Sequence, residues 1–362
     1  MIKRKGAGKV KKAVKRIAAV LAGIVILIIA VVVILYRNEM KSLSSLRKLD
    51  DYGMFQMTYY GDYGFDDFLK SGAKSDSDIE AFVTKRLLKG LPFDLGITGA
   101  GCTAFVVRNE KGEVLYGRNF DFPYAPSLQL FTNPHNGYAS VSTVNLSFAG
   151  YDEDNLPSGL NFDSFFALAA PYLPFDGMNE KGVAMALLAV PNAKGPNNPD
   201  HVTLNTTTAI RLVLDKAANV QEAVDLLRNY NIYFSGHIDC HYLIADATGK
   251  SVIVEYYDGE IQVVETDKDY QIASNFIAYQ GLNIGEGGTE FDRYNRAEEV
   301  IREHGNVLTS DQAVGLLAEI GVRSGETDRL QWSVVYNLNT GETRLFPHRN
   351  RDKVFETLLK MQ

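Results

Sequence analysis

The pattern of hydrophobic and polar positions first marks out one long apolar segment. From Ile17 to Tyr36 the chain has twenty residues without a charge, and nearly all of them are apolar. A helix of that length spans about 30 Å, the thickness of the hydrocarbon core of a bilayer. A cleavable signal peptide has an apolar core of only about 7–15 residues, followed by a small-residue cleavage site. No such site follows here, so the pattern predicts an uncleaved transmembrane helix over residues 17–36.

The next part, residues 37–101, mixes aromatic, glycine and acidic residues. Its stretch SDSDIEAFVTKRLLKGL (75–91) has apolar residues at helical spacing, and Ser77 or Asp78 is the expected N-terminal cap. This composition is too aromatic for a disordered linker. We therefore predict that residues 37–101 pack on the body of the protein.

From residue 102 onward, short strands joined by turns dominate. CTAFVV and VLYGRNF flank a glycine-containing turn, and HYLIADATGKSVIVEYY and WSVVYNLNTGETRLF repeat that pattern. Helical stretches lie between the hairpins: TTTAIRLVLDKA, VQEAVDLLRNY, EFDRYNRAEEVIREHG and SDQAVGLLAEIG. Hairpins with helices grouped between them favour an α+β domain on antiparallel sheets over a doubly wound parallel fold. No linker divides this part, so residues 102–362 are expected to form one domain.

The charge distribution gives the apolar segment an orientation. Residues 1–16 contain eight Lys or Arg and no acidic residue, and since the whole chain carries −7, the remainder carries −15. A basic arm of this kind could bind nucleic acid, but here a membrane-length apolar helix follows it. Basic flanks stay in the cytoplasm. We expect a basic cytoplasmic tail, a single-pass anchor in the cell membrane, and an acidic remainder outside the cytoplasm.

The cysteines and histidines limit the chemistry. The two cysteines, Cys102 and Cys240, lack the spacing of a zinc ribbon or a disulfide framework, and the six histidines form no HExxH motif. We expect no metal and no cofactor.

Cys102 is the candidate nucleophile. A lone cysteine is more often a small buried hydrophobic residue, but its hairpin brings GRNFDF back beside it. Arg118 and Asp121 then lie near the thiol, where a guanidinium favours the reactive thiolate and a carboxylate could orient an amine. An arginine–aspartate pair of purely structural role is also common on hairpins.

A series of motifs resembles one enzyme family. GCTAFVV, GRNFDF, DGMNEKGVAMALLAVP, HYLIADATGKSVIVEY, ASNF, FDRYNRA and QWSVVYNLNTGE follow one another over roughly residues 102–355. In this order they resemble the choloylglycine hydrolases, which include bile salt hydrolases and penicillin V acylases and are related to acid ceramidase and N-acylethanolamine amidase. The resemblance implies the four-layer αββα sandwich of N-terminal-nucleophile hydrolases. It also implies hydrolysis of the amide C–N bond in N-acyl amides through an acyl-enzyme intermediate.

The resemblance also implies that Cys102 becomes a chain terminus, since enzymes of this family use the cysteine's own α-amine as the base. An α-amine titrates near ~7.7–8.0 and a free thiol near ~8.5, so proton exchange between them is nearly isoenergetic. We therefore expect autocatalytic cleavage of the Gly101–Cys102 bond. Acid ceramidase-like relatives keep the upstream piece as a bound subunit, and residues 37–101 could be released as one here.

Five side chains match the family's catalytic positions. By resemblance, Cys102 is the nucleophile, Arg118 stabilises the thiolate and Asp121 holds the amine. Asn275 directs its amide at the tetrahedral oxyanion, and Arg293 is a second active-site arginine.

The second oxyanion donor is by resemblance the backbone N–H of Ala189, where relatives usually carry Asn or Tyr. Other motif residues have simpler structural explanations: a turn for Asn179, packing for Trp332, a buried thiol for Cys240 and an exposed helix position for Arg296.

Two other classes of protein remain open from the residues alone. One is a papain-like protease pairing Cys102 with His201, His237 or His241, although CGSCW-type surroundings are missing. The other is an anchored, non-enzymatic binding module. The expected partners are a small-molecule N-acyl amide and the membrane; nucleic acid is not expected, and self-association into a homo-oligomer is left open.

Overall fold

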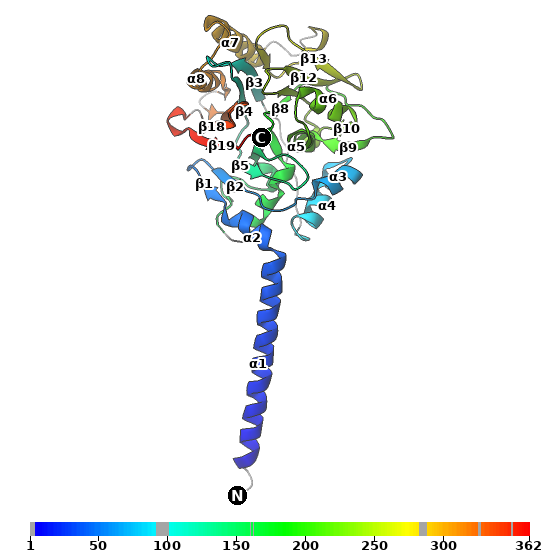
Figure 1. Cartoon of the computed structure of the whole chain (residues 1–362), viewed down its shortest axis with the longest axis vertical. Helices are drawn as coiled ribbons and strands as arrows, with labels where there is room; N and C mark the ends of the chain where they lie inside the picture. Colours follow the sequence, from blue (N-terminus) through cyan, green and yellow to red (C-terminus); the bar gives the residue numbers. More distant parts are fainter. Residues whose placement is uncertain are drawn as a thin grey trace.

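A computed structural model of the chain describes residues 4–91, 101–159, 161, 163–281, 288–324, 327–348 and 350–362. The chain forms a body of stacked sheets and helices, from which one long helix extends (Figure 1). The remaining residues include 92–100, so the last part of the predicted upstream segment lies outside the described residues.

The larger sheet has nine strands and runs through the middle of the body. In order across the sheet these are β1 (Arg47–Lys48), β2 (Met54–Thr58), β5 (Ser127–Thr132), β6 (Ser140–Asn145), β7 (Pro174–Asn179), β8 (Ala184–Ala189), β11 (Cys240–Ala245), β12 (Ser251–Tyr257) and β13 (Glu260–Val264).

The smaller sheet has six strands and contains the Cys102 hairpin. In order they are β14 (Gln271–Ala273), β3 (Gly101–Arg108), β4 (Val114–Asp121), β17 (Leu330–Asn337), β18 (Glu342–Pro347) and β19 (Phe355–Leu358). Every residue of β4 and β17 is buried, because the sheet is covered on both faces. These strands therefore lack the alternation of polar and apolar residues that a half-exposed strand shows.

Helices cover the outer face of each sheet. On the larger sheet lie α5 (Thr206–Lys216) and α6 (Val220–Arg228), and on the smaller sheet lie α7 (Thr289–Glu303) and α8 (Ser310–Ile320) (Figure 1). With β3 packed against β8 between them, the sheets and helices form four layers. The predicted α+β sandwich is confirmed, and so are the predicted hairpins and helices.

Local sequence fixes where the covering helices begin. Capping boxes start two of them: Asn205 and Thr208 exchange side-chain-to-backbone hydrogen bonds at α5, and Thr309 and Gln312 do so at α8. Smaller elements complete the body: β9 (Val202–Asn205), β10 (Tyr230–Tyr233), β15 (Arg323–Ser324), β16 (Thr327–Asp328), η1 (Leu146–Ala149), η2 (Asp163–Tyr172), η3 (Ser235–His237), η4 (Tyr279–Gly281) and η5 (Arg351–Lys353).

Residues 37–91 form part of the larger sheet. They contain β1, β2, α2 (Arg37–Ser44), α3 (Phe65–Ser71) and α4 (Asp76–Arg86). Strand β2 pairs with β5 in parallel, whereas the other neighbouring strands of the two large sheets are antiparallel throughout the described residues. The prediction of Ser77 or Asp78 as the cap of α4 was wrong, because Ser75 caps it by accepting from the backbone N–H of Asp78.

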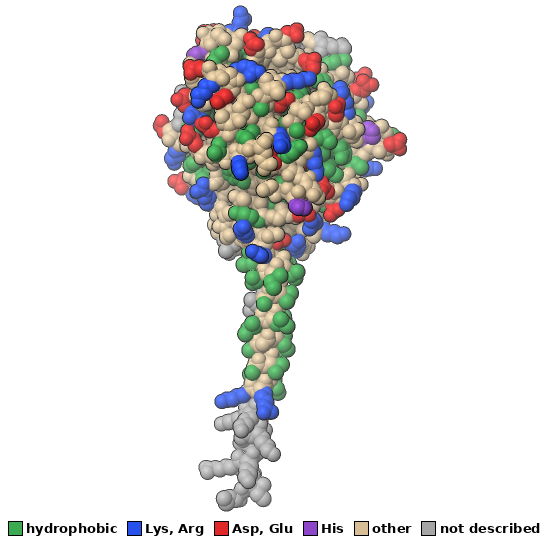
Figure 2. Space-filling view, in the orientation of Figure 1, with side chains coloured by type: hydrophobic (Ala, Val, Ile, Leu, Met, Phe, Trp, Pro, Cys, Tyr) green, Lys and Arg blue, Asp and Glu red, His purple; other side chains and the backbone are tan. Residues whose placement is uncertain are grey.

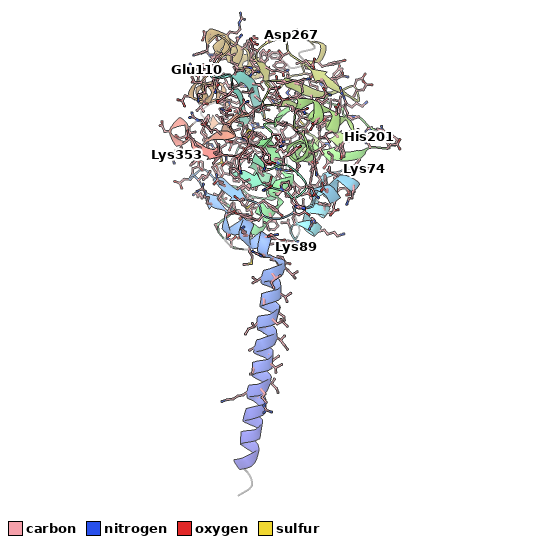
Figure 3. All side chains as sticks on the ribbon, in the orientation of Figure 1. Lys74, Lys89, Glu110, His201, Asp267 and Lys353 are labelled. Atoms are coloured by element: carbon pink, nitrogen blue, oxygen red, sulfur yellow. The ribbon has the colours of Figure 1, made fainter. Side chains whose placement is uncertain are left out.

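The apolar segment, up to Leu35, forms the part of α1 (Arg4–Leu35) that is nearer the body. Its stretch Val14–Leu35 is long and apolar enough to cross a membrane, and none of it is buried in the body. Figure 2 shows the apolar stretch of this helix covered by hydrophobic side chains, with basic side chains where that stretch ends on the side away from the body. At the other end, Lys89, labelled in Figure 3, pairs with Glu39 of α2 at 3.3 Å.

Candidate active site

The β3–β4 hairpin brings the predicted nucleophile and its partners together. Gly101 lies opposite Asp121 and Cys102 opposite Phe120, while Arg118 faces Ala104 two residues further along β3. The side chain of Cys102 is completely buried. Both Cys102 and Cys240 are free thiols. The hairpin thus places the thiol, a guanidinium and a carboxylate at one end of two paired strands.

Arg118 lies directly against the thiol. Its Nη2 is 3.5 Å from Cys102 Sγ and 3.2 Å from the carbonyl oxygen of Leu187, to which it donates. The guanidinium lies over the rings of Phe120 and Trp332, at 4.9 and 5.3 Å from the ring centroids. A buried cation therefore sits beside the sulfur, stabilised by aromatic faces on one side.

A buried carboxylate, Asp176 of β7, balances the charge of Arg118. Its Oδ2 lies 3.3 Å from Arg118 Nε, and the carboxylate also accepts hydrogen bonds from Trp332 Nε1 at 2.9 Å and Tyr336 OH at 2.7 Å. Sequence reasoning missed this residue, although it begins the DGMN motif. Trp332 therefore does more than pack, because its N–H orients the carboxylate that faces Arg118.

Some surroundings of the Cys102 thiol raise its pKa and others lower it. Burial raises the pKa of Cys102 above its ordinary value. Arg118 opposes this most strongly, Asp121 adds to the rise, and Arg293 and the backbone amide of Ala189 lower the pKa. With burial the largest effect, the thiol of the intact chain keeps its proton, and forming the thiolate requires a base.

Asn275 connects the nucleophile to the larger sheet. It follows β14, the neighbour of β3, and its Oδ1 accepts from the backbone N–H of Cys102 at 2.8 Å. The same oxygen accepts from Arg293 Nη2 at 2.7 Å, and Nδ2 donates to the carbonyl oxygen of Ala189 at 2.7 Å. These three bonds fix both the position and the orientation of the amide.

Arg293 of α7 links Asn275 to Asp121. Its Nη1 lies 3.1 Å from Asp121 Oδ2, and the other carboxylate oxygen accepts from the backbone N–H of Val322 at 2.8 Å. Both charged side chains are buried. Arg296, one turn further along α7, instead lies on the surface with Glu299 and Glu319.

The predicted site residues thus lie in one cluster made by β3, β4, β8, the end of β14 and α7. In the part of the chain that the structure describes, no histidine side chain is hydrogen-bonded to Cys102. His241, one of the candidates for a papain-like pair, instead contacts Glu255 through Nδ1 at 2.9 Å. The geometry gives no support to a cysteine–histidine pair.

Two neighbouring cavities lead away from the cluster. The first, of about 400 Å³, is lined by Ala189 and Asn275 together with His237 and Asp239. The second, of about 530 Å³, shares His237 and Asp239 and reaches Lys74 in the link between α3 and α4. Lys74 and His201 are labelled on the same flank of the body in Figure 3. A molecule near Asn275 could therefore extend toward residues 37–91.

Comparison with known sequences gives a match that begins at the cysteine. The sequence profile of the linear amide C–N hydrolases of the choloylglycine hydrolase family matches residues 102–294. The bile salt hydrolase/transferase of Clostridium perfringens (strain 13 / Type A) is 27% identical over 234 residues, covering 60% of this chain and 66% of that protein. The penicillin V acylase of Pectobacterium atrosepticum is 32% identical over 111 residues, covering 28% of this chain and 29% of that protein. Each alignment spans less than two thirds of the relative's length.

Solved structures show the same fold. A mutant of the conjugated bile acid hydrolase of Clostridium perfringens superposes with a TM-score of 0.52 at 18% identity, covering 71% of this chain and 92% of that one. The penicillin V acylase of Agrobacterium tumefaciens superposes with a TM-score of 0.50 at 20% identity, covering 71% and 86% of the two chains.

Proposed function

Because this chain belongs to the choloylglycine hydrolase family of linear amide C–N hydrolases, and is therefore an amidohydrolase, we propose that it cleaves N-acyl amides with Cys102 as the nucleophile. One observation carries the proposal: Cys102 Sγ lies 3.5 Å from a buried guanidinium, while its main-chain nitrogen is held at 2.8 Å by Asn275. A sulfur and a nitrogen of the same residue are thus both positioned. The family assignment argues against a non-enzymatic binding module.

The base in this proposal is the nitrogen of Cys102 itself, once the Gly101–Cys102 bond is cut. In an autocatalytic cut, Sγ attacks the carbonyl carbon of Gly101, the C–N bond breaks and the nitrogen takes up the thiol proton. Water then hydrolyses the thioester, which leaves a carboxylate on Gly101 and a free α-amine on Cys102. In this proposal Asp121, which lies opposite Gly101, orients the neutral amine and stabilises the ammonium that forms when the amine takes up the thiol proton.

The same groups then act on a substrate. The α-amine accepts the thiol proton, and Sγ attacks the amide carbonyl carbon to form a tetrahedral oxyanion. Collapse breaks the C–N bond, and the α-ammonium returns the proton to the departing amine. The acyl group stays on sulfur as a thioester until water releases it as a carboxylic acid. The net reaction consumes one water and yields one amine and one acid.

Asn275 and the backbone N–H of Ala189 are the proposed oxyanion donors. Both residues line the cavity of about 400 Å³, and Asn275 Nδ2 already donates to the Ala189 carbonyl, so one of its two hydrogens remains for substrate. One such donor contributes about 2.7–4 kcal/mol to the reduction of the barrier. Arg293 orients this amide through Oδ1.

We further propose that residues 17–36 anchor the enzyme in the cell membrane, with residues 1–16 in the cytoplasm and the body outside. The exposed apolar surface of α1 supports an anchor, and the charge difference across it supports that orientation. The hydrophobic acyl amides that suit the family would partition into the adjacent lipid.

The upstream residues would remain bound after cleavage. Strand β2 pairs with β5 over five residues, and Tyr63 donates to the buried carboxylate of Asp215 at 2.7–2.8 Å. The link between α3 and α4 also bonds to the body, since the N–H of Ala73 donates to the carbonyl oxygen of Thr203 at 2.9 Å. These contacts would connect the catalytic domain, residues 102–362, to its anchor without a covalent bond.

The test uses the full chain in detergent. We expect wild type to migrate as two fragments on a denaturing gel, the larger one beginning with Cys102, and to release amine from a panel of N-acyl amides. Cys102→Ala should remain a single chain of 40.1 kDa and release none. Cys240→Ala, which changes the other buried thiol, on β11 opposite Ala189, is the matched control and should behave as wild type. Hydrolysis by Cys102→Ala, or by uncleaved wild type, would refute the mechanism.

A further inference from the structure

A buried histidine–glutamate pair lies near the proposed oxyanion asparagine. His241 of β11 and Glu255 of β12 lie side by side on neighbouring strands of the larger sheet, with Nδ1 and Oε1 2.9 Å apart, and each side chain is 1% exposed. The chemistry proposed above uses neither residue. A carboxylate buried to this extent costs several kcal/mol unless hydrogen bonds compensate it, so its partners indicate what it does.

The other partners of Glu255 are two consecutive backbone amides. Oε1 accepts from the N–H of Ala278 and Oε2 from the N–H of Tyr279, both at 2.9 Å. Because the His241 Nδ1 bond is made to a carboxylate, Nδ1 carries the proton. Both oxygens of Glu255 are therefore engaged, and two of its three bonds go to one turn of main chain.

That turn begins three residues after Asn275. Three residues span at most about 10 Å, so a shift of the backbone at Ala278 would also displace Asn275. On the other side, Asn275 follows β14, which pairs with β3. Between the two anchors, the ring of Phe276 stacks on that of Phe291 of α7, with the centroids 4.5 Å apart. The asparagine is thus held from β14 on one side and from Glu255 on the other.

We propose that Glu255, oriented by His241, is a positioning residue that holds Asn275 where its amide can reach the oxyanion. The inference rests on the proposed function, because it assigns Glu255 a role only through Asn275. A displacement of about 1 Å in a catalytic group can lower the rate about 100-fold. Losing the hydrogen bonds from Glu255 to Ala278 and Tyr279 should therefore lower kcat, with substrate binding largely retained.

His241 keeps the carboxylate ionised in this buried place. Burial alone would raise the pKa of Glu255, but the hydrogen bond and charge of His241, together with the two amides, bring it below its ordinary value.

His241 Nε2 has no hydrogen-bond partner among the described residues, and His241 lines a cavity of about 330 Å³. The other titratable groups that line it are Glu265, Lys268, Tyr270 and Tyr294. Thr266 and Lys268, the sequence neighbours of Asp267 at the top of Figure 3, line the same cavity.

The decisive variant is Glu255→Gln in the full-length, cleaved enzyme. Glutamine has a single acceptor oxygen and turns an NH2 group toward one of the backbone donors, so one bond becomes a repulsion. We expect kcat to fall about 10- to 100-fold with KM within about twofold. Glu265→Gln, which lines the same cavity but does not bond to residues 278–279, is the matched control and should retain wild-type kcat.

A second variant keeps the inference testable if Glu255→Gln fails to fold. In His241→Gln the amide still donates to Glu255, but the pKa of the carboxylate rises because the charge of the imidazole is gone. The carboxylate then gains a proton at a higher pH, and the acid side of the kcat profile should move upward in pH. A purely structural role would lower the melting temperature without moving that profile.

Each outcome bears on one of the two proposals. Wild-type kcat in Glu255→Gln, or an unmoved acid side in His241→Gln, overturns the positioning role while leaving Cys102 chemistry intact. Absence of hydrolysis by the cleaved wild-type enzyme on the whole amide panel would count against the proposed function itself.

Discussion

The two sides of the Gly101–Cys102 bond contribute different kinds of interaction. On the C-terminal side, Cys102 lies among buried charges, with Arg118 opposite Asp176 and Arg293 opposite Asp121. On the N-terminal side, the described residues 37–91 supply two strands and a buried tyrosine, and none of their side chains is hydrogen-bonded to the thiol. Under the proposed function, one region supplies the chemistry and the other supports the fold. Substitutions on the two sides should therefore separate activity from assembly.

The largest effect is expected at Asp176 and concerns stability. This carboxylate belongs to the buried charges around Cys102 and also helps to hold the two sheets together. Asp176→Asn keeps the shape of the side chain but leaves the Arg118 charge buried without a counter-ion. Breaking one partner of a buried pair lowers the free energy of unfolding by about 3–5 kcal/mol. Calorimetric melting of the full chain in detergent measures this change.

Asp152→Asn is the control for Asp176. Asp152 is exposed, and its Oδ1 accepts from the backbone N–H groups of Asp154 and Asn155, which an asparagine oxygen can also do. We expect it to melt as wild type. If Asp176→Asn also melted at the wild-type temperature, the buried charge of Arg118 would not need that carboxylate for stability.

The next effect is expected at Asn275 and concerns activity. Asn275→Ala removes one oxyanion donor, and such a loss lowers kcat about 100- to 1000-fold, or about 2.7–4 kcal/mol. Steady-state hydrolysis of the best amide measures it, with Asn295→Ala, an exposed position on α7, as control. Retention of kcat in Asn275→Ala would remove the asparagine from the mechanism, whereas the docking of residues 37–91 should not change.

Much of the catalytic side could be predicted from sequence because its contacts are local or carried by motifs. Folding one hairpin brings Arg118 and Asp121 to Cys102, and the motif order indicated Asn275 and Arg293. Asp176 was missed because its role depends on register: β7 lies in the other sheet, and only stacking of the two sheets brings it to Arg118.

The upstream side could be predicted much less well. Strand β2 pairs in parallel with β5, which follows it only after several intervening elements, and no turn signal marks such a pairing. The partner of Tyr63 is 152 residues away. Long-range pairs of this kind leave no periodic pattern, so the sequence indicated a helix within 75–91 and packing on the body, but not the pairing of β2 or the partner of Tyr63.

A smaller effect is expected at Tyr63, on the upstream side. Tyr63→Phe removes the hydroxyl that donates to Asp215 and leaves that carboxylate to Arg211, which lies 3.2 Å away. Losing a hydrogen bond to a buried charged group costs about 1–3 kcal/mol. We expect a lower melting temperature and easier release of the upstream fragment, while kcat of the intact assembly stays unchanged.

The matched control for Tyr63 is Tyr60→Phe, since Tyr60 is half-buried and its ring contacts Lys41. Pull-down through a tag on the C-terminus, followed by quantification of the upstream fragment, measures docking directly. If Tyr63→Phe lowered kcat without releasing more of the upstream fragment, the assignment of activity to one region and assembly to the other would be wrong.

The smallest effect is expected at Arg296. Comparing it with Arg293 on the same helix separates the role of the buried guanidinium from the role of α7 itself. Arg296 lies three residues after Arg293 on α7, but its guanidinium contacts Glu299 and Glu319 at the surface. Exposed ion pairs often contribute nothing measurable, so Arg296→Ala should hydrolyse amides and melt as wild type does. Arg293→Ala removes the bonds to Asp121 and Asn275 and should lose most of its activity. Equal losses in both variants would mean that α7, and not the buried guanidinium, positions the asparagine.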